Sequence, residues 1–316
     1  MASAASTESS AVTSPRSRAA AAVALSYMMV TLPLALRVLS VGPPIGAQQS
    51  ESPGRVWLMV GSHVLVAAAL ALVTWRRNAR SVSASRASAV TNVFADWLPL
   101  IIVSFLYAEL PWLMTAYRGG TAVVYHDAWV QAAEQAVFGT QPSHTLAGAL
   151  PFRWLSEGVH LGYVSYYGII YVPPVVLYAR RHREAFARCA AALLLAFTSC
   201  FLVFSFFPVE VPRYAWPAPP GTPEGPVRLA ALWILREGSS RGAAFPSSHA
   251  AVSVAQTVSL WLAGERRMAI VIGTFTALLV VGAVYGGFHY AVDMVVGVAV
   301  GIACGVTGVV LGRRAQ

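Results

Sequence analysis

Eight long apolar segments recur along the chain, and they constrain its fold more than any other sequence feature. An apolar run of about 20 residues is long enough to cross a bilayer as an α-helix. The composition agrees, since 57% of the residues are hydrophobic, 11% are charged and the mean hydropathy is +0.61. These values exclude an ordinary soluble domain and predict an all-α, polytopic membrane helical bundle. The eight predicted transmembrane helices span about residues 19–39, 56–75, 97–117, 158–178, 186–207, 248–263, 268–286 and 290–311.

These segments divide the 316 residues into three parts. Residues 1–18 are rich in Ser, Ala and Thr, and they predict a disordered tail. Residues 19–90 carry two accessory transmembrane helices, and residues 91–316 carry a six-helix membrane core. A cleaved signal sequence is an alternative for the first segment, because Gly46-Ala47-Gln48 resembles a cleavage site. The length of the segment favours an uncleaved helix.

The positions of the arginines predict how the helices are oriented. All 22 basic residues are arginine, and the formal net charge is +9. Arginines that flank apolar spans explain this charge better than nucleic-acid binding does, so membrane lipids are the expected surroundings. If the N- and C-termini are cytoplasmic, as in a plasma or inner membrane, the dense arginine clusters all lie on the inner side. These inner arginines are Arg16, Arg18, Arg76, Arg77, Arg80, Arg86, Arg180, Arg181, Arg183, Arg188, Arg266, Arg267, Arg313 and Arg314.

Two long loops on the outer side and two acidic residues complete this outline. Residues 118–157 contain the amphipathic stretch 128–138, which predicts an interfacial helix. Residues 210–241 are proline-rich and then helical around 227–236, which suggests a lid or an acceptor-binding loop. Asp96 and Glu109 lie at or within the third predicted span, where charge is costly. We interpret them as a structural polar pair rather than a proton pathway.

Two histidine motifs flank one predicted helical hairpin. His249 ends Phe245-Pro246-Ser247-Ser248-His249, and His289 is followed by Asp293. Two membrane crossings return the chain to the side it left, so the histidines are expected side by side at the outer face. On a helix, His289 and Asp293 would share one face. A carboxylate that holds one imidazole nitrogen leaves the other free to attack phosphorus, so the pattern indicates phosphoryl transfer.

The start of the first helix of this hairpin predicts an anion site. Pro246 suits the first helical position, and Ser247 and Ser248 lie where the first turn has free N–H groups. Such a helix start attracts phosphate. Two other interpretations stay open. The histidines could have only a structural role, as hydrogen bonds between helices. Alternatively, His249, His289 and Asp293 could bind zinc, since His-x3-Asp is also the spacing of metal ligands on a helix.

The motifs resemble those of the type 2 phosphatidic acid phosphatase superfamily. Pro246-Ser247-Ser248-His249 is similar to its Pro-Ser-Gly-His motif, and His289 with Asp293 matches the end of its third motif. Arg213 stands for the arginine of the first motif. The resemblance implies that His289 attacks phosphorus, Asp293 orients it, Arg213 holds the phosphoryl oxygens and His249 protonates the leaving oxygen. It implies no metal and no cofactor, and it makes residues 91–316 a phosphatase-like core.

Within the superfamily, the chain looks most like the branch that contains inositol phosphorylceramide synthases. Residues 244–250 and Phe138-Gly139-Thr140-Gln141-Pro142 carry that resemblance. Several positions depart from the family pattern and remove two of its usual cations. These are Phe206, in place of the motif lysine, Tyr214, Ser248, Gly282 and Ala283, the last in place of an arginine.

Two arginines are therefore weighed as the phosphate clamp. Arg213 is the motif cation, with an interfacial anchor as the alternative role. Arg241 lies eight residues before His249 and is a second candidate, with a solvated loop charge as the alternative.

The resemblance implies a membrane phosphatase or phosphotransferase with its site on the non-cytoplasmic face. Its substrate would be a lipid phosphate: phosphatidate, a polyprenyl diphosphate, or a headgroup donor to a sphingolipid-like alcohol. A non-catalytic membrane protein, such as a lipid transporter that keeps the fold, is the alternative.

Overall fold

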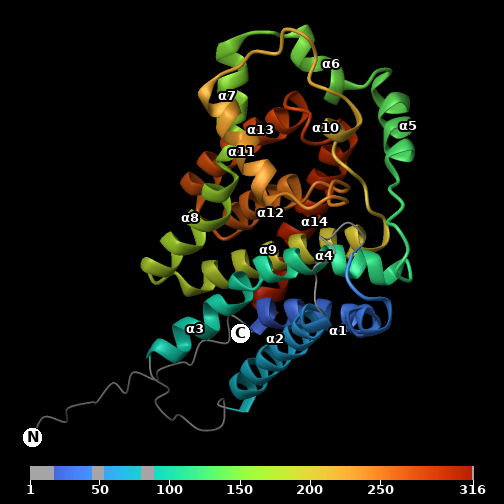
Figure 1. Cartoon of the computed structure of the whole chain (residues 1–316). Helices are drawn as coiled ribbons and strands as arrows, with labels where there is room; N and C mark the ends of the chain where they lie inside the picture. The colour runs from blue at the N-terminus through green and yellow to red at the C-terminus, as the bar shows by residue number, and fades with distance from the viewer. Residues whose placement is uncertain (1–17, 45–52, 80–88, 315–316) are drawn as a thin grey trace, which may run out of the picture.

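A computed structural model describes residues 18–44, 53–79 and 89–314, all of it helix and connecting loop (Figure 1). Residues 1–17 of the predicted tail, the cleavage-like Gly46-Ala47-Gln48 and the inner Arg80 and Arg86 lie outside these residues, whereas Arg18 begins α1. The helices are α1 (Arg18–Val41), α2 (Pro53–Ala79), α3 (Ala89–Ile101), α4 (Val103–Tyr117), α5 (Asp127–Phe138), α6 (Pro142–Ala149), α7 (Arg153–Val164), α8 (Tyr166–Ala179), α9 (Arg183–Phe206), α10 (Pro212–Ala215), α11 (Pro226–Gly238), α12 (Ser248–Leu262), α13 (Arg266–Tyr285) and α14 (Ala291–Arg314).

The predicted membrane bundle is confirmed. In the described residues, 6 helical segments are long and apolar enough to cross a bilayer, and up to 7 if one bent pair is counted. The bent pair is α7 with α8, which meet at 44°, where one straight span was expected. The expected helices at 128–138 and 227–236 are present as α5 and α11. The six unbent spans are Arg18–Val41, Gly54–Trp75, Val93–Tyr117, Arg183–Phe206, Arg266–Tyr285 and Ala291–Gly312.

The prediction of a full span at 248–263 differs from the structure. This segment is α12, which has 15 residues and is about 22 Å long. It is too short to cross the roughly 30 Å hydrocarbon core alone. The start of α12 is buried, since Ser247 is fully buried and Ser248 is 6% exposed. The turn predicted after α12 is present, with Gly264 at φ +88°.

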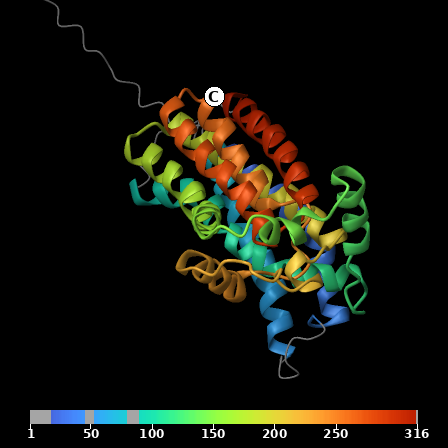
Figure 2. The same ribbon diagram turned by 90° about the horizontal axis from the view of Figure 1, so that it is seen from above.

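Helix α12 is the centre of the core. It packs against α9, α13 and α14, which Figure 2 shows as aligned rods. Glycines one turn apart on α14 allow α12 to approach closely. A Cβ at Gly297 would lie 2.6 Å from the Ser247 carbonyl oxygen, and one at Gly301 would lie 2.5 Å from that of Ala251. Gly305 continues the stripe, so α12 is fixed against the helix that carries Asp293.

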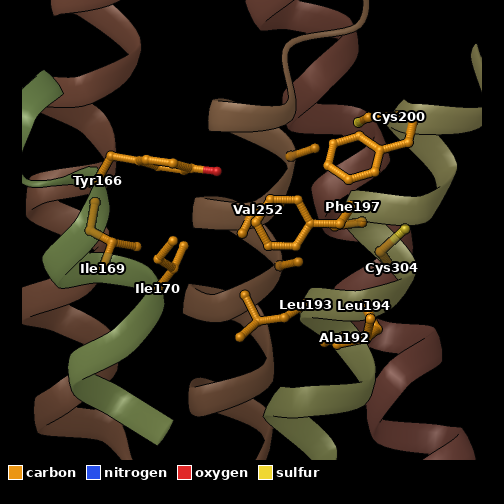
Figure 3. Packing of buried hydrophobic residues seen from close by; sticks show 14 of the residues in the cluster. Tyr166, Ile169, Ile170, Ala192, Leu193, Leu194, Phe197, Cys200, Val252 and Cys304 are labelled. Carbon is orange, nitrogen blue, oxygen red and sulfur yellow. The ribbon is translucent and has the colours of Figure 1, made fainter. Parts of the chain in front are cut away.

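Apolar side chains fill the space between α8, α9 and α12. Figure 3 shows Tyr166 and Ile170 of α8 facing Val252 of α12, with Phe197 of α9 on the other side. These side chains belong to one continuous cluster of buried residues that joins the bundle. Because close packing fixes the spacing of these helices, it also fixes the side chains at their ends.

The accessory helices are joined to the core by a buried polar contact. His63 of α2 lies 3.0 Å from Glu109 of α4 through Nδ1, and 3.0 Å from the Met28 carbonyl oxygen of α1 through Nε2. Asp96 instead accepts a hydrogen bond from the Tyr178 hydroxyl at 3.1 Å. Asp96 and Glu109 thus each contact a polar side chain of another helix, Tyr178 of α8 and His63 of α2.

Candidate active site

Four side chains form a line through the centre of the core. Asp293 Oδ2 lies 3.4 Å from His289 Nδ1, and His289 Nε2 lies 3.3 Å from His249 Nδ1. At the far end, His249 Nε2 lies 3.4 Å from the hydroxyl of Tyr163. His289 is 3% exposed and Asp293 is fully buried. The structure thus brings together the three residues that the sequence singled out, and it adds Tyr163.

The start of α14 places His289 and Asp293 in contact. The expectation that both lie on one helix is wrong, because α14 begins at Ala291 and His289 precedes it. Asp293 Oδ2 instead accepts the Tyr290 backbone N–H at 2.9 Å, as the third helical residue does in half of a capping box. The same oxygen meets His289, so the cap holds the imidazole and the carboxylate together.

The start of α12 places His249. Pro246 lies before the helix, after a cis peptide bond, and not at its first position as expected. Ser247 is the N-cap, and its hydroxyl accepts the Ala250 N–H at 3.3 Å. The Ser247 N–H donates to the Asp293 carbonyl oxygen at 3.1 Å, which joins the two motifs. The Ser247 N–H is therefore engaged, whereas the N–H of Ser248 lies in the first turn of α12 and can bind an anion.

The hydrogen-bonding capacity of the line links the protonation states of its members. If Asp293 is ionised it can only accept, and His289 then carries its proton on Nδ1 and keeps a lone pair on Nε2. His249 then donates from Nδ1 to that lone pair, and its Nε2 accepts from Tyr163. Burial, the nearby His249 and Arg213 lower the pKa of His289 well below its usual value. With this tautomer, the Nε2 lone pair of His289 faces His249.

Arg213 lies beside the loop that precedes His289. Its backbone N–H donates to the Gly287 carbonyl oxygen at 3.1 Å. Its guanidinium donates to the Ser239 hydroxyl at 2.6 Å and to the Leu235 carbonyl oxygen at 3.4 Å, at the end of α11. The motif arginine is thus near the histidines, and uncharged oxygen atoms hold it.

Arg241 lies in a different environment. Its Nε is 2.5 Å from the Glu210 carboxylate, and its side chain is 60% exposed. Its guanidinium also lies 4.8 Å from the centre of the Tyr214 ring. An exposed arginine with a carboxylate partner has its charge already matched, which favours Arg213 over Arg241 as the clamp.

The packing explains the departures from the family motifs. A Cβ at Gly282 would overlap the Val159 carbonyl oxygen, so the close crossing of α7 and α13 requires glycine there. The neighbouring Ala283 is fully buried, so an arginine there would have to displace its surroundings. Phe206 is 38% exposed and contacts Tyr117, so it lies at the end of α9, away from the histidines.

Two cavities flank the line of side chains. The tyrosine cavity, about 250 Å³, is lined by Ser248 and His249 at one end and by apolar residues of α4, α8, α9 and α11. The arginine cavity, about 280 Å³, is lined by residues of α6, α11 and the 212–222 loop, together with Gly286 and Gly287. Five tyrosines line the first cavity: Tyr107, Tyr163, Tyr166, Tyr167 and Tyr171. Three basic side chains line the second: His144, Arg213 and Arg228.

Glu134 of α5 supports the site from outside. Its carboxylate is fully buried and accepts the Ala291 N–H at 3.0 Å and the Ser143 hydroxyl at 3.2 Å. Gln131, one turn earlier, donates to the Tyr290 hydroxyl at 2.9 Å. The stretch interpreted as an interfacial helix thus also holds the loop of His289. Sequence reasoning missed Glu134, although a lone acidic residue on the apolar side of an amphipathic helix was a usable signal.

The geometry does not converge on a metal. Asp293 contacts Nδ1 of His289, whereas His249 faces Nε2 on the opposite side of the ring. Throughout the described residues, no three His, Cys, Asp or Glu side chains are arranged to hold a metal ion.

Comparison with known proteins agrees with the motif geometry. Residues 128–306 match the model of the PAP2 superfamily, which covers more than half of the chain. No curated protein and no solved structure matched.

Proposed function

Because the chain belongs to the PAP2 superfamily, we propose that it is an integral membrane lipid phosphatase or phosphotransferase with a phosphohistidine intermediate. The superfamily contains metal-independent phosphatases that act on lipid phosphates. The observation that carries the proposal is the line from Asp293 through His289 to His249, with contacts of 3.4 and 3.3 Å. This arrangement supplies a held nucleophile and a proton donor that face one another.

In the first step, the phosphoryl group of the substrate enters between the two imidazoles. The Nε2 lone pair of His289 forms a bond to phosphorus, and the bond from phosphorus to the leaving oxygen breaks. His249, in its protonated form, gives that oxygen a proton. Asp293 stabilises the positive charge that develops on His289. Arg213 and the N–H of Ser248 meet the phosphoryl oxygens.

In the second step, water or a lipid alcohol attacks phosphorus and gives its proton to His249. The bond from phosphorus to His289 breaks, and the imidazole regains its lone pair. Water yields inorganic phosphate, whereas an alcohol yields a transferred headgroup. The two outcomes use the same residues, so the acceptor alone decides between a phosphatase and a transferase.

The tyrosine cavity supports a lipid substrate. It starts at His249 and is lined mainly by aromatic and aliphatic side chains. The leaving group must lie on the side of His249, because that residue protonates it. Candidate substrates are phosphatidate, a polyprenyl diphosphate, or a phospholipid that gives its headgroup to a sphingolipid-like alcohol, as in the branch with inositol phosphorylceramide synthases.

Orientation is part of the proposal. The arginine distribution favours cytoplasmic termini and an outward site. Cysteines at Glu224 and Arg267 test it, since both side chains are exposed and the native cysteines are buried. In intact cells, an impermeant thiol reagent should label the Glu224→Cys variant and leave Arg267→Cys unmodified. The reverse labelling would place the site on the cytoplasmic face.

The test of activity is a panel of lipid phosphates incubated with the purified protein, with and without alcohol acceptors. Products are resolved by mass spectrometry. His289→Ala is expected to reduce turnover by orders of magnitude, because no other group in the site replaces a covalent nucleophile. If no lipid yields a product, or if His289→Ala keeps more than about a tenth of the activity, a non-catalytic role such as lipid transport is favoured.

A further inference from the structure

The arginine cavity contains a cation that the catalytic scheme does not use. Arg228, near the start of α11, is 8% exposed and lines the cavity together with Arg213. Its backbone N–H donates to Glu157, but its guanidinium has no hydrogen-bond or ion-pair partner among the residues that the structure describes. A buried and unpaired charge is costly, so an unmatched arginine beside a cavity calls for an anionic partner.

A carboxylate next to the start of α11 is already engaged by backbone groups. Glu157 of α7 accepts the backbone N–H of Val227 at 2.9 Å and that of Arg228 at 3.2 Å. It thereby caps the start of α11 and fixes the backbone from which the Arg228 side chain extends. The cap positions Arg228 and does not pair with its guanidinium.

A second nitrogen base lines the same cavity without a partner. His144 of α6 packs against Trp216, with ring centres 5.1 Å apart. Its Nδ1 is buried and has no hydrogen-bond partner in the part of the chain that the structure describes. Arg213, Arg228 and His144 come from three different elements and meet at one cavity. The cavity therefore offers hydrogen-bond donors that match the oxygens of a phosphate group.

The cavity also lies next to the reaction centre. Gly286 and Gly287 line it, and His289 follows two residues later. Arg213 forms part of its wall and bonds Ser239, which lines the tyrosine cavity. Neither catalytic histidine lines the arginine cavity. A phosphate group held there is thus distinct from the one that His289 attacks.

We propose that Arg228, Arg213 and His144 form a second phosphate subsite beside the reaction centre. It takes either the non-reacting phosphate of a lipid diphosphate or the free phosphate product. The subsite rests on the proposed function for its role. Arg213 lies at the boundary between the two cavities and serves both phosphate groups, whereas Arg228 and His144 serve the second one alone.

Binding measured without turnover tests the subsite. The His289→Ala variant serves as the background, because it holds ligands without consuming them. Titration calorimetry with inorganic phosphate, a lipid monophosphate and a lipid diphosphate of the same chain gives three affinities. Adding Arg228→Gln should lower the affinity for inorganic phosphate, for the lipid diphosphate or for both by about tenfold or more. The matched control is Arg236→Gln, on the same helix and outside both cavities, which should change each affinity less than twofold.

The pattern of losses identifies the source. If Arg228→Gln lowers only the affinity for the lipid diphosphate, the subsite holds a second phosphate of the substrate. If it lowers only the affinity for inorganic phosphate, the subsite holds the product. Equal affinities with and without Arg228→Gln, or an equal loss with Arg236→Gln, would overturn the proposal. If Arg228→Gln does not fold, Arg228→Lys replaces it, since it keeps the charge and loses the planar fork. If wild type releases no phosphate from any lipid but binding depends on Arg228, the proposed function fails and the subsite stands.

Discussion

The two cavities that flank the histidines differ in chemistry, although they have similar volumes and share α11 as a wall. The tyrosine cavity, about 250 Å³, has aromatic and aliphatic walls and ends at His249. The arginine cavity, about 280 Å³, has three basic side chains and ends at the glycines before His289. One suits the apolar part of a lipid and the other suits its charged part. The site therefore has an apolar side and a basic side, and Arg213 lies at the boundary between them.

The largest expected effect in this comparison concerns the boundary residue. Arg213→Lys keeps the charge but loses the planar fork that donates to two oxygens at once. We expect turnover to fall at least tenfold, measured as product formed from the best lipid of the panel. Arg241→Gln is the matched comparison, since that side chain is exposed and paired with Glu210. Should Arg241→Gln prove the more damaging change, the clamp would have to be reassigned to Arg241.

The next largest effect concerns the volume of the tyrosine cavity. Ile234 lines it from α11, and Ile234→Trp should partly fill it. We expect the KM for a long-chain lipid phosphate to rise about fivefold, with a smaller change for a short-chain analogue. Leu229→Trp provides the control, because Leu229 lies on α11, is 54% exposed and lines neither cavity. Equal effects on both chain lengths would mean that the cavity does not hold the lipid chain.

A smaller effect is expected at the end of the line of side chains. Tyr163→Phe removes the hydroxyl that lies 3.4 Å from His249 Nε2 and keeps the stacked ring. One hydrogen bond of this kind is worth about 1 kcal/mol, so turnover should fall roughly threefold to fivefold. Measured across pH, the loss should alter the pH profile as well as the maximum rate, since Tyr163 acts through His249. A loss above a hundredfold would show that Tyr163 takes part in the chemistry directly.

The smallest effect is expected on removal of metal ions. Asp293 and His249 contact opposite ring nitrogens of His289, which suits a relay of protons better than a metal site. We expect full activity in excess EDTA, measured as phosphate release. Loss of activity on chelation, with recovery on addition of zinc, would support the zinc interpretation instead.

The sequence predicted the parts of this site that depend on residue type and separation. His249, His289 and Asp293 could be found because a helical hairpin returns the chain to its starting side, and the structure brings all three together. The first residues of the two helices could not be predicted as well. Helix α14 begins after His289, and Pro246 lies before α12, since the caps at Tyr290 and Ser247 decide where each helix starts.

The residues that sequence reasoning missed depend on packing between distant segments. Glu134 reaches Ala291 across 157 positions, and Tyr163 reaches His249 across 86. In the sequence, Arg228 cannot be distinguished from other arginines of the outer loop, since only the fold shows that it is buried. The glycine stripe at Gly297 and Gly301 was visible in the sequence as small residues four apart, which is a known signal for close helix contact.

The central claim is that His289 carries the phosphoryl group in a covalent intermediate. A lipid phosphate labelled on phosphorus, mixed with the protein and quenched within milliseconds in alkali, tests it directly. We predict label on the protein that survives alkali, is lost in mild acid, maps to the peptide containing His289 and is absent from His289→Ala. Release of labelled product with no labelled protein at any quench time, or label on a different residue, would contradict the account.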